Sequence, residues 1–282
     1  MGTAMLISFL LFCIIFEVVY SSVEFLNLTY VEPEYLENLL TTGQYEEFAR
    51  LLQIDDVNLV KPAEGLEGGD ILLRPWQREQ ARQGVIWASS DNSKWKKVVP
   101  YVIDRKGYTA AERAAILKAI VKWNRDMFWY IRFRPRVFDK DYVMFFNGTG
   151  CYSNLGKVGG QQPISLRANG CLTEGTILHE MAHTVGIIHE HDRPDRDKYI
   201  KILPQNIPKE WQSQYEKSSY QDVQILGPYD YYSVMHYPIP APHTHLPSPL
   251  SPPQKKGSTP KRIGQREEQT QIDKDKIKRL YS

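Results

Sequence analysis

The chain has 282 residues, of which 42% are hydrophobic and 24% charged, a composition typical of a globular protein with a sizeable core and room for a smaller appendage. Its formal net charge is +2, and the sequence has no long basic stripe. These values argue against nucleic acid and anionic membrane surfaces as partners.

A nearly continuous apolar run, Met5 to Tyr20, stands near the amino terminus and is interrupted only by Glu17. The run is too short to cross a bilayer comfortably, and Val19 and Ser21 suit the positions that signal peptidase reads. We therefore interpret residues 1–21 as a signal peptide, which predicts a secreted, extracellular mature chain without a membrane span. A buried hydrophobic helix and a membrane anchor are the alternatives.

The segment after the signal peptide, residues 22–82, is acidic at first and becomes rich in glycine around EGLEGGD, residues 64–70. This pattern predicts a short helical segment followed by a loop. Asn27 and Asn147 each begin an N-glycosylation sequon, which agrees with secretion.

One long helix is predicted over residues 109–127, because Thr109 and Glu112 form a capping box and an apolar face recurs at helical spacing. That face consists of Ile116, Ile120, Trp123 and Met127. Short strands are predicted at residues 98–103, 131–133, 142–146 and 163–166, separated by Asn/Gly turns. A long helix combined with short strands indicates an α+β fold.

The chain has three cysteines, and an even pair is left once Cys13 has been removed together with the signal peptide. Cys151 and Cys171 remain, and they suit one disulfide in an oxidising compartment. Two buried thiols are the alternative.

The segment HEMAHTVGIIH, residues 179–189, holds three of the seven histidines. On a helix, His179 and His183 share a face and can bind one metal ion, while Glu180 can take a proton from a water bound there. A glycine at 186 can end the helix and turn the chain, which brings His189 round as a third ligand. Three protein ligands leave one position open, as in catalytic zinc sites. An amphipathic helix with surface histidines is the alternative.

Residues 238–260 hold eight of the 18 prolines, so that neither a helix nor an internal strand is expected there. We expect an extended, solvated loop. A ligand for a partner domain is the alternative.

The histidine segment continues as HEHDRPDRD, and residues 179–197 as a whole resemble the signature of the astacin family of secreted zinc endopeptidases, within the metzincins. Residues 229–237, YDYYSVMHY, resemble the methionine turn of that family. The similarity covers about residues 97–237, including 149–166, and resumes at 263–266.

The resemblance implies a two-lobed metzincin (zincin-like) catalytic domain, residues 83–282, with a mixed twisted sheet and an active-site helix, preceded by a propeptide, residues 22–82. It implies one zinc ion bound by the three histidines, with Glu180 as the general base and protein or peptide substrates. Met235 would lie under the metal, and Tyr237 would hydrogen-bond the oxyanion of the tetrahedral intermediate. A core aromatic is the alternative role of Tyr237.

Further roles follow from the same resemblance. Glu190 matches the residue that receives the buried new amino terminus. An edge strand that pairs with extended substrate is implied for Cys151, Tyr152, Ser153 and Asn154. The Cys151–Cys171 pair fits one of the two disulfides of the family.

Upstream, LEGGD, residues 66–70, resembles the propeptide motif F-x-G-D, although leucine replaces phenylalanine and a residue is inserted near the glycines. Asp70 would then coordinate the zinc in the zymogen, and a turn-forming aspartate is the alternative. A trypsin-like protease cutting between Arg78 and Arg82 would release it.

The sequence departs from the family at the second disulfide. Tyr130 stands where its first cysteine is expected, and the chain stops one residue before its partner. The proline-rich segment also replaces the usual stretch after the methionine turn, which leaves substrate preference open. The leading hypothesis is an active zinc endopeptidase made as a zymogen, and the alternative is a catalytically silent secreted binding protein on the same scaffold.

Overall fold

The computed structural model describes residues 66–67, 70–74, 77, 94–207, 209–220, 223–237, 250–251 and 263–282. The predicted signal peptide, most of the predicted propeptide and the sequon at Asn27 lie outside these residues. Among the helices that are described, none combines the length and the apolar character needed to cross a membrane.

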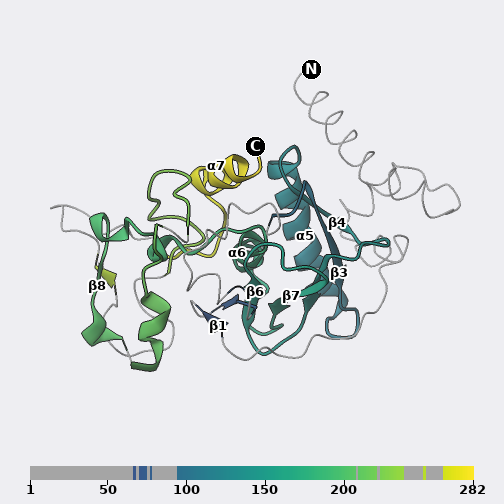
Figure 1. Ribbon diagram of the computed structural model, residues 1–282. Helices are drawn as coiled ribbons and strands as arrows, with labels where there is room; N and C mark the ends of the chain where they lie inside the picture. The colour runs from purple at the N-terminus through teal and green to yellow at the C-terminus, as the bar shows by residue number, and fades with distance from the viewer. Residues whose placement is uncertain are drawn as a thin grey trace, which may run out of the picture.

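A mixed seven-stranded sheet, with the strand order β1-β2-β6-β7-β5-β3-β4, forms one side of the molecule (Figure 1). The pairs β3/β4, β3/β5 and β5/β7 are parallel, whereas β6 runs antiparallel to β7. The strands are β1 (Leu66–Glu67), β2 (Ile71–Leu72), β3 (Val98–Ile103), β4 (Arg132–Pro135), β5 (Tyr142–Phe146), β6 (Cys151–Asn154) and β7 (Gln161–Leu166). Together with the helices, this sheet confirms the predicted α+β class.

The long helix α5 (Ala110–Met127) begins at the predicted capping box, in which the side chains of Thr109 and Glu112 each accept a hydrogen bond from the other residue's backbone N–H. All four residues of the predicted apolar face are buried. The capping box therefore identified the start of this helix, and the periodicity identified the face that it turns to the core.

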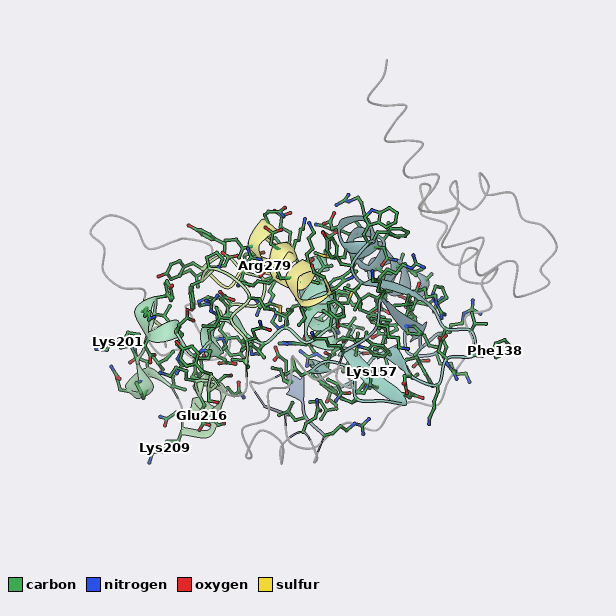
Figure 2. All side chains as sticks on the ribbon, turned by 45° about the horizontal axis from the view of Figure 1, so that its top comes forward. Phe138, Lys157, Lys201, Lys209, Glu216 and Arg279 are labelled. Atoms are coloured by element: carbon green, nitrogen blue, oxygen red, sulfur yellow. A yellow bond between two sulfur atoms is a disulfide. The ribbon has the colours of Figure 1, made fainter. Side chains whose placement is uncertain are left out.

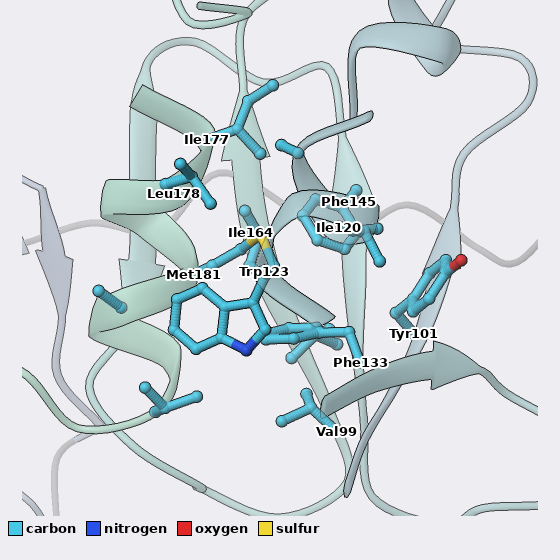
Figure 3. Packing of buried hydrophobic residues seen from close by; sticks show 14 of the residues in the cluster. Val99, Tyr101, Ile120, Trp123, Phe133, Phe145, Ile164, Ile177, Leu178 and Met181 are labelled. Atoms are coloured by element: carbon cyan, nitrogen blue, oxygen red, sulfur yellow. The ribbon is translucent and has the colours of Figure 1, made fainter. Parts of the chain in front are cut away.

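The core lies between α5, the sheet and a second helix, α6 (Glu174–Thr184) (Figure 3). Trp123 is fully buried at its centre, where its ring meets Phe133 edge-on with centroids 5.4 Å apart. Its indole N–H donates to the carbonyl of Ile131 at 3.0 Å, so that burial leaves no polar atom of the ring without a partner. On the facing side, Leu178 and Met181 of α6 close the cluster (Figure 3).

Helix α6 starts at Thr173, whose side chain accepts from the backbone N–H of Thr176. Gly175 lies in its first turn, where the backbone of Arg266 crosses closely. A Cβ at this position would collide with the carbonyl group of Arg266, so that only glycine allows the carboxyl-terminal segment to pack here.

After α6 the chain forms a second lobe of short elements on the far side of that helix from the large sheet (Figure 1). Lys201, Lys209 and Glu216 lie at this end of the molecule, while Phe138 and Lys157 lie at the sheet end (Figure 2). The elements of this lobe are the 3-10 helices η2 (Glu190–Asp192), η3 (Arg196–Lys198), η4 (Pro204–Asn206) and η5 (Lys209–Tyr215) and the strands β8 (Lys201–Ile202) and β9 (Leu250–Ser251). The last helix, α7 (Gln271–Leu280), lies beside α5 (Figure 1).

Two sequence-based expectations need correction. The segment around EGLEGGD was expected to be a loop, but Leu66–Glu67 and Ile71–Leu72 form an antiparallel pair that extends the sheet. The proline-rich segment was expected to be an extended, solvated loop, but Leu250–Ser251 pairs with β8. Each of these strands has only two residues, and so short a stretch carries no periodic signal. The rest of 238–260 lies outside the described residues.

Candidate active site

The first two histidines of the motif project from successive turns of α6. His179 and His183 are buried, and their Nε2 atoms are 3.1 Å apart. The spacing of four residues places them on one face, as the motif predicted.

The glycine at 186 turns the chain after the helix. Its φ is +102°, a backbone conformation that residues other than glycine rarely adopt. Its N–H donates to the carbonyl of His183 at 2.8 Å. The reversal brings His189 back to the helix, where its Nε2 lies 3.2 Å from that of His183. Three imidazole nitrogens from two elements thus meet at one point.

The hydrogen bonds of the rings suit a zinc ion. The Nδ1 atoms of His179 and His183 lie 2.8 and 2.7 Å from the carbonyls of Val234 and Ile187, so that each ring donates there and keeps a lone pair on Nε2. The Nδ1 of His189 lies 3.3 Å from a carboxylate oxygen of Asp192. Two nitrogens bound to one tetrahedral zinc are about 3.3 Å apart, close to the separations found here.

Glu180 lies between the two helical histidines in sequence and is buried. Among the described residues its Oε2 has no hydrogen-bond partner. Burial, together with the nearby charge of Asp70, raises the pKa of the Glu180 carboxyl well above its ordinary value.

Asp70 lies against the three histidines. Its carboxylate oxygens are 3.1, 3.5 and 3.0 Å from the Nε2 atoms of His179, His183 and His189. Although burial raises it, the nearby charge of His189 holds the pKa of Asp70 well below its ordinary value. These four residues form a group whose ligand atoms could hold one metal ion.

The methionine turn makes backbone hydrogen bonds with residues of the site. Met235 is buried, and its carbonyl accepts from the backbone N–H of Glu190 at 3.0 Å. Asp273, from α7, fixes this turn because its carboxylate accepts from the Ser233 hydroxyl at 2.5 Å and from the Val234 N–H at 3.0 Å. The turn therefore connects the first histidine with the carboxyl-terminal helix.

Tyr237 lies beside the third histidine. Its ring centroid is 4.8 Å from that of His189, and it stacks on His191 at 4.0 Å. Burial, with further contributions from Asp70 and Asp192, raises the pKa of Tyr237 well above its ordinary value. A neutral phenol, whose O–H can donate a hydrogen bond, therefore stands next to the metal-binding group.

Glu190 follows His189 and is the centre of a buried ionic network. Its carboxylate accepts from Arg193 at 2.8 Å, from Lys276 at 2.6 Å and from the backbone N–H of Asp230 at 2.8 Å. A cavity of about 40 Å³ adjoins this network, and its lining includes Glu190, Arg193 and Lys276.

The strand expected to pair with substrate, β6, lies along the site. The Ser153 hydroxyl donates to the carbonyl of Glu180 at 3.0 Å, which ties the strand to α6. On its outer side β6 pairs in parallel with β2, with Ile71 opposite Ser153 and Leu72 opposite Asn154. Residues 70–72 of the same chain thus occupy this edge. A disulfide joins Cys151, the first residue of β6, to Cys171.

The second sequon residue, Asn147, is exposed, and both ends of its amide are engaged. Its Nδ2 donates to the carbonyl of Gly107 at 3.0 Å, and its Oδ1 accepts from the N–H of Ala168 at 3.0 Å. The side chain therefore joins two loops at the end of the sheet.

Three residues near the site had no role in the sequence analysis. Arg266 donates to the carbonyl of His236 at 3.0 Å, and Gln77, fully buried, donates to the carbonyl of Leu155 at 3.0 Å. The third is Lys276. Arg266 belongs to a stretch already matched to the family and could have been singled out, whereas Gln77 and Lys276 lie in segments without a motif.

A helix with two histidines, a glycine turn, a third histidine and a buried methionine turn, set beside a mixed sheet, defines the metzincin class of zinc-binding folds. The family model that matches the chain is Astacin, a peptidase family, over residues 88–282. The chain therefore belongs to the astacin family.

Individual relatives agree with this assignment. Zinc metalloproteinase nas-15 of Caenorhabditis elegans is 40% identical over 185 residues, which are 65% of this chain and 31% of the relative. The astacin-like metalloendopeptidase of Coturnix japonica is 35% identical over 221 residues, 77% of this chain and 51% of the relative. The chain thus spans a third to a half of the length of these relatives.

Among solved structures, high choriolytic enzyme 1, a hatching enzyme zinc-protease from Oryzias latipes, matches with a TM-score of 0.62 and 36% identity, over 68% of this chain and 96% of that chain. The predicted cofactor, one zinc ion, is confirmed by the family and by the three-histidine group. The predicted enzyme class, a zinc metalloendopeptidase, is also that of the relatives.

Proposed function

We propose that the chain is a secreted zinc-dependent endopeptidase, made as a zymogen, that hydrolyses peptide bonds of extracellular proteins. The observation that carries the proposal is the convergence of three imidazole Nε2 atoms, 3.1 to 3.2 Å apart in successive pairs, beside the buried carboxyl of Glu180. Family membership supports the same activity.

A zinc ion held by His179, His183 and His189 supplies Lewis acidity, which polarises the scissile carbonyl and acidifies a water molecule. Glu180 takes the proton of that water at its carboxylate and returns it to the leaving amine. Tyr237 donates its O–H to the developing negative charge on the substrate oxygen, a role supported by its position next to His189.

The zymogen proposal rests on the segment from Asp70 to Gln77. Asp70 offers its carboxylate to the metal-binding group, and β2 covers the edge of β6. Gln77 ties this segment to the rest of the chain, because its side chain donates to the carbonyl of Leu155 and accepts from the N–H of Arg74 at 2.9 Å. We propose residues 1–21 as the signal peptide, 22–82 as the propeptide and 83–282 as the catalytic domain.

Activation then requires a trypsin-like protease that cuts between Arg78 and Arg82. The new amino terminus enters the cavity beside Glu190, and the negative charge of Glu190 in the lining of this cavity supports that role. Removal of the segment takes the carboxylate of Asp70 away from the three histidines and frees the edge of β6.

The main test treats the full-length chain with a trypsin-like protease and measures hydrolysis of an unstructured protein with and without a zinc chelator. We expect chelator-sensitive hydrolysis. Glu180→Gln should retain zinc and lose roughly 10²- to 10⁴-fold in kcat, because the general base is gone. A chain that binds zinc but hydrolyses nothing after activation favours the silent binding protein. Full activity of Glu180→Gln contradicts the role of this glutamate.

Latency has its own test. Asp70→Ala should give hydrolysis before any protease treatment, because the carboxylate no longer competes with water for the metal. Asp275→Ala, a change at an exposed carboxylate of α7, is the matched control and should stay latent. If Asp70→Ala is as latent as the unaltered chain, Asp70 is not the blocking ligand.

A further inference from the structure

An aliphatic cluster adjoins the histidine group where the chain covers its own site. Ile71 and Leu73 are only 6% and 8% exposed and form a buried cluster with Leu155, and Ile188 packs against this cluster. Leu155 follows the last residue of β6, and Ile188 precedes His189. Two residues of the proposed catalytic domain thus bury two side chains of the segment to be removed.

The strand register explains why these side chains meet. Ile71 pairs with Ser153 in a parallel ladder, so that both side chains point to the same face of the sheet. Ser153 points towards α6, because its hydroxyl reaches the carbonyl of Glu180. Leu73, two residues on, takes the same face. Any extended chain that pairs with β6 therefore turns alternate side chains towards Leu155 and Ile188.

We propose that Leu155 and Ile188 form an apolar subsite that selects an aliphatic side chain of the protein substrate. The inference rests on the proposed peptidase function and names a specificity of the same site. Asp70 lies over the metal-binding group, and the two aliphatic residues follow it by one and three positions. The selected substrate residue therefore lies within three residues of the scissile bond.

The chemistry of the cluster decides between kinds of side chain. A branched aliphatic group regains the contacts that Ile71 and Leu73 make in the latent chain. A carboxylate or ammonium at the same place loses its hydration among apolar atoms. Aspartate in this position should therefore be disfavoured more strongly than alanine.

The experiment uses the full chain after activation by a trypsin-like protease. Peptides are varied one position at a time over three residues on each side of the scissile bond, with leucine, isoleucine, alanine or aspartate. At one of these positions, leucine or isoleucine should exceed alanine in kcat/KM by roughly tenfold. Equal rates for aliphatic, alanine and aspartate peptides at every position overturn the proposal.

Variants assign the preference to these two residues. Leu155→Ala and Ile188→Ala should each reduce the preference for the aliphatic over the alanine peptide several-fold. Val121→Ala, an equally aliphatic truncation at a half-exposed position of α5, should leave the preference as it was. Leu155→Lys should shift the preference towards aspartate. A preference that persists in both alanine variants refutes the assignment.

A binding measurement separates this inference from the proposed activity. A synthetic peptide of residues 66–77 is titrated against the activated protein, beside the same peptide carrying Ile71→Asp and Leu73→Asp. The altered peptide should bind at least about tenfold more weakly. Absence of hydrolysis of any peptide refutes the proposed function, whereas equal binding of the two peptides refutes the subsite.

Discussion

The two sides of the metal-binding group are built by different forces. On the helix side, His179 and His183 project from α6, while Leu178 and Met181 of the same helix are buried in the main hydrophobic core. On the other side, His189 is followed by Glu190, which an arginine, a lysine and a backbone N–H hold in place. One pair of nitrogens is held by apolar packing and the third by buried charge.

This difference predicts different responses to mutation. Apolar burial is non-directional, so that its loss lowers the stability of the whole domain in proportion to the area and cavity involved. A buried ionic network depends on every member, because the loss of one partner leaves a charge without compensation. Damage to the first side should unfold the protein, and damage to the second should change the position of His189 first.

The largest effect is expected for Trp123→Ala. It removes a fully buried indole at the junction of α5, α6 and the sheet, and it should cost about 3–5 kcal/mol in the free energy of unfolding. Urea denaturation followed by circular dichroism measures this cost. Trp129→Ala is the control, because Trp129 is 74% exposed and its loss should change stability by less than about 0.5 kcal/mol. Equal losses of stability in the two variants would contradict the position of Trp123 at the centre of the core.

A medium effect is expected for Lys276→Met, which leaves Glu190 with Arg193 and the Asp230 N–H. We expect a loss of about 1–3 kcal/mol in stability and a fall of roughly tenfold in zinc affinity, because the residue after His189 is less well fixed. Urea denaturation measures the loss in stability, and competition with a zinc chelator measures the fall in zinc affinity.

Lys278→Met is the control on the same helix, since Lys278 lies 4.0 Å from a half-exposed Asp275 and should contribute little. If Lys276→Met weakens stability but leaves zinc affinity at the level of this control, the network supports the fold and does not position His189.

The same contrast separates what the sequence predicted from what it did not. Helix α5 was predicted with its cap and its buried face, because both are local patterns. The histidine cluster was also predicted, since a helix spacing and one glycine bring its members together. The zinc cofactor was confirmed, whereas the roles of Glu180, Tyr237 and Asp70 stay predictions.

Long-range pairings escaped prediction. The pairing of β2 with β6 joins Ile71 to Ser153, and the ion pair of Lys276 with Glu190 spans 86 residues. A two-residue strand and a lone lysine carry no periodicity, and only the folded chain decides which partners they meet. The pairing of β2 with β6 and the ion pair of Lys276 with Glu190 therefore could not be predicted from the sequence.

The smallest effect is expected where the end of α5 and the residues just after it meet α7. The ammonium of Lys278 lies 5.9 Å from the ring centroid of Tyr130, and Lys274 pairs with Asp126 at 2.7 Å, so that two contacts join the end of α5 to α7. Although partial burial raises it, the hydrogen bonds from Lys274 and Arg125 hold the pKa of Asp126 below its ordinary value of 3.8.

A carboxyl with a lowered pKa in the folded state stabilises the fold above its unfolded pKa, and this stability is lost as the pH falls through the folded value. Asp126→Asn should therefore cost up to about 1 kcal/mol at pH 7, and progressively less as the pH falls from 3.8 through the folded pKa, below which the unaltered chain has lost the same contribution. Urea denaturation at pH 7 and at a pH below the folded pKa measures the difference, with Asp275→Asn as the control. A cost that is equal at both pH values would mean that Asp126 acts through packing and that its charge contributes nothing.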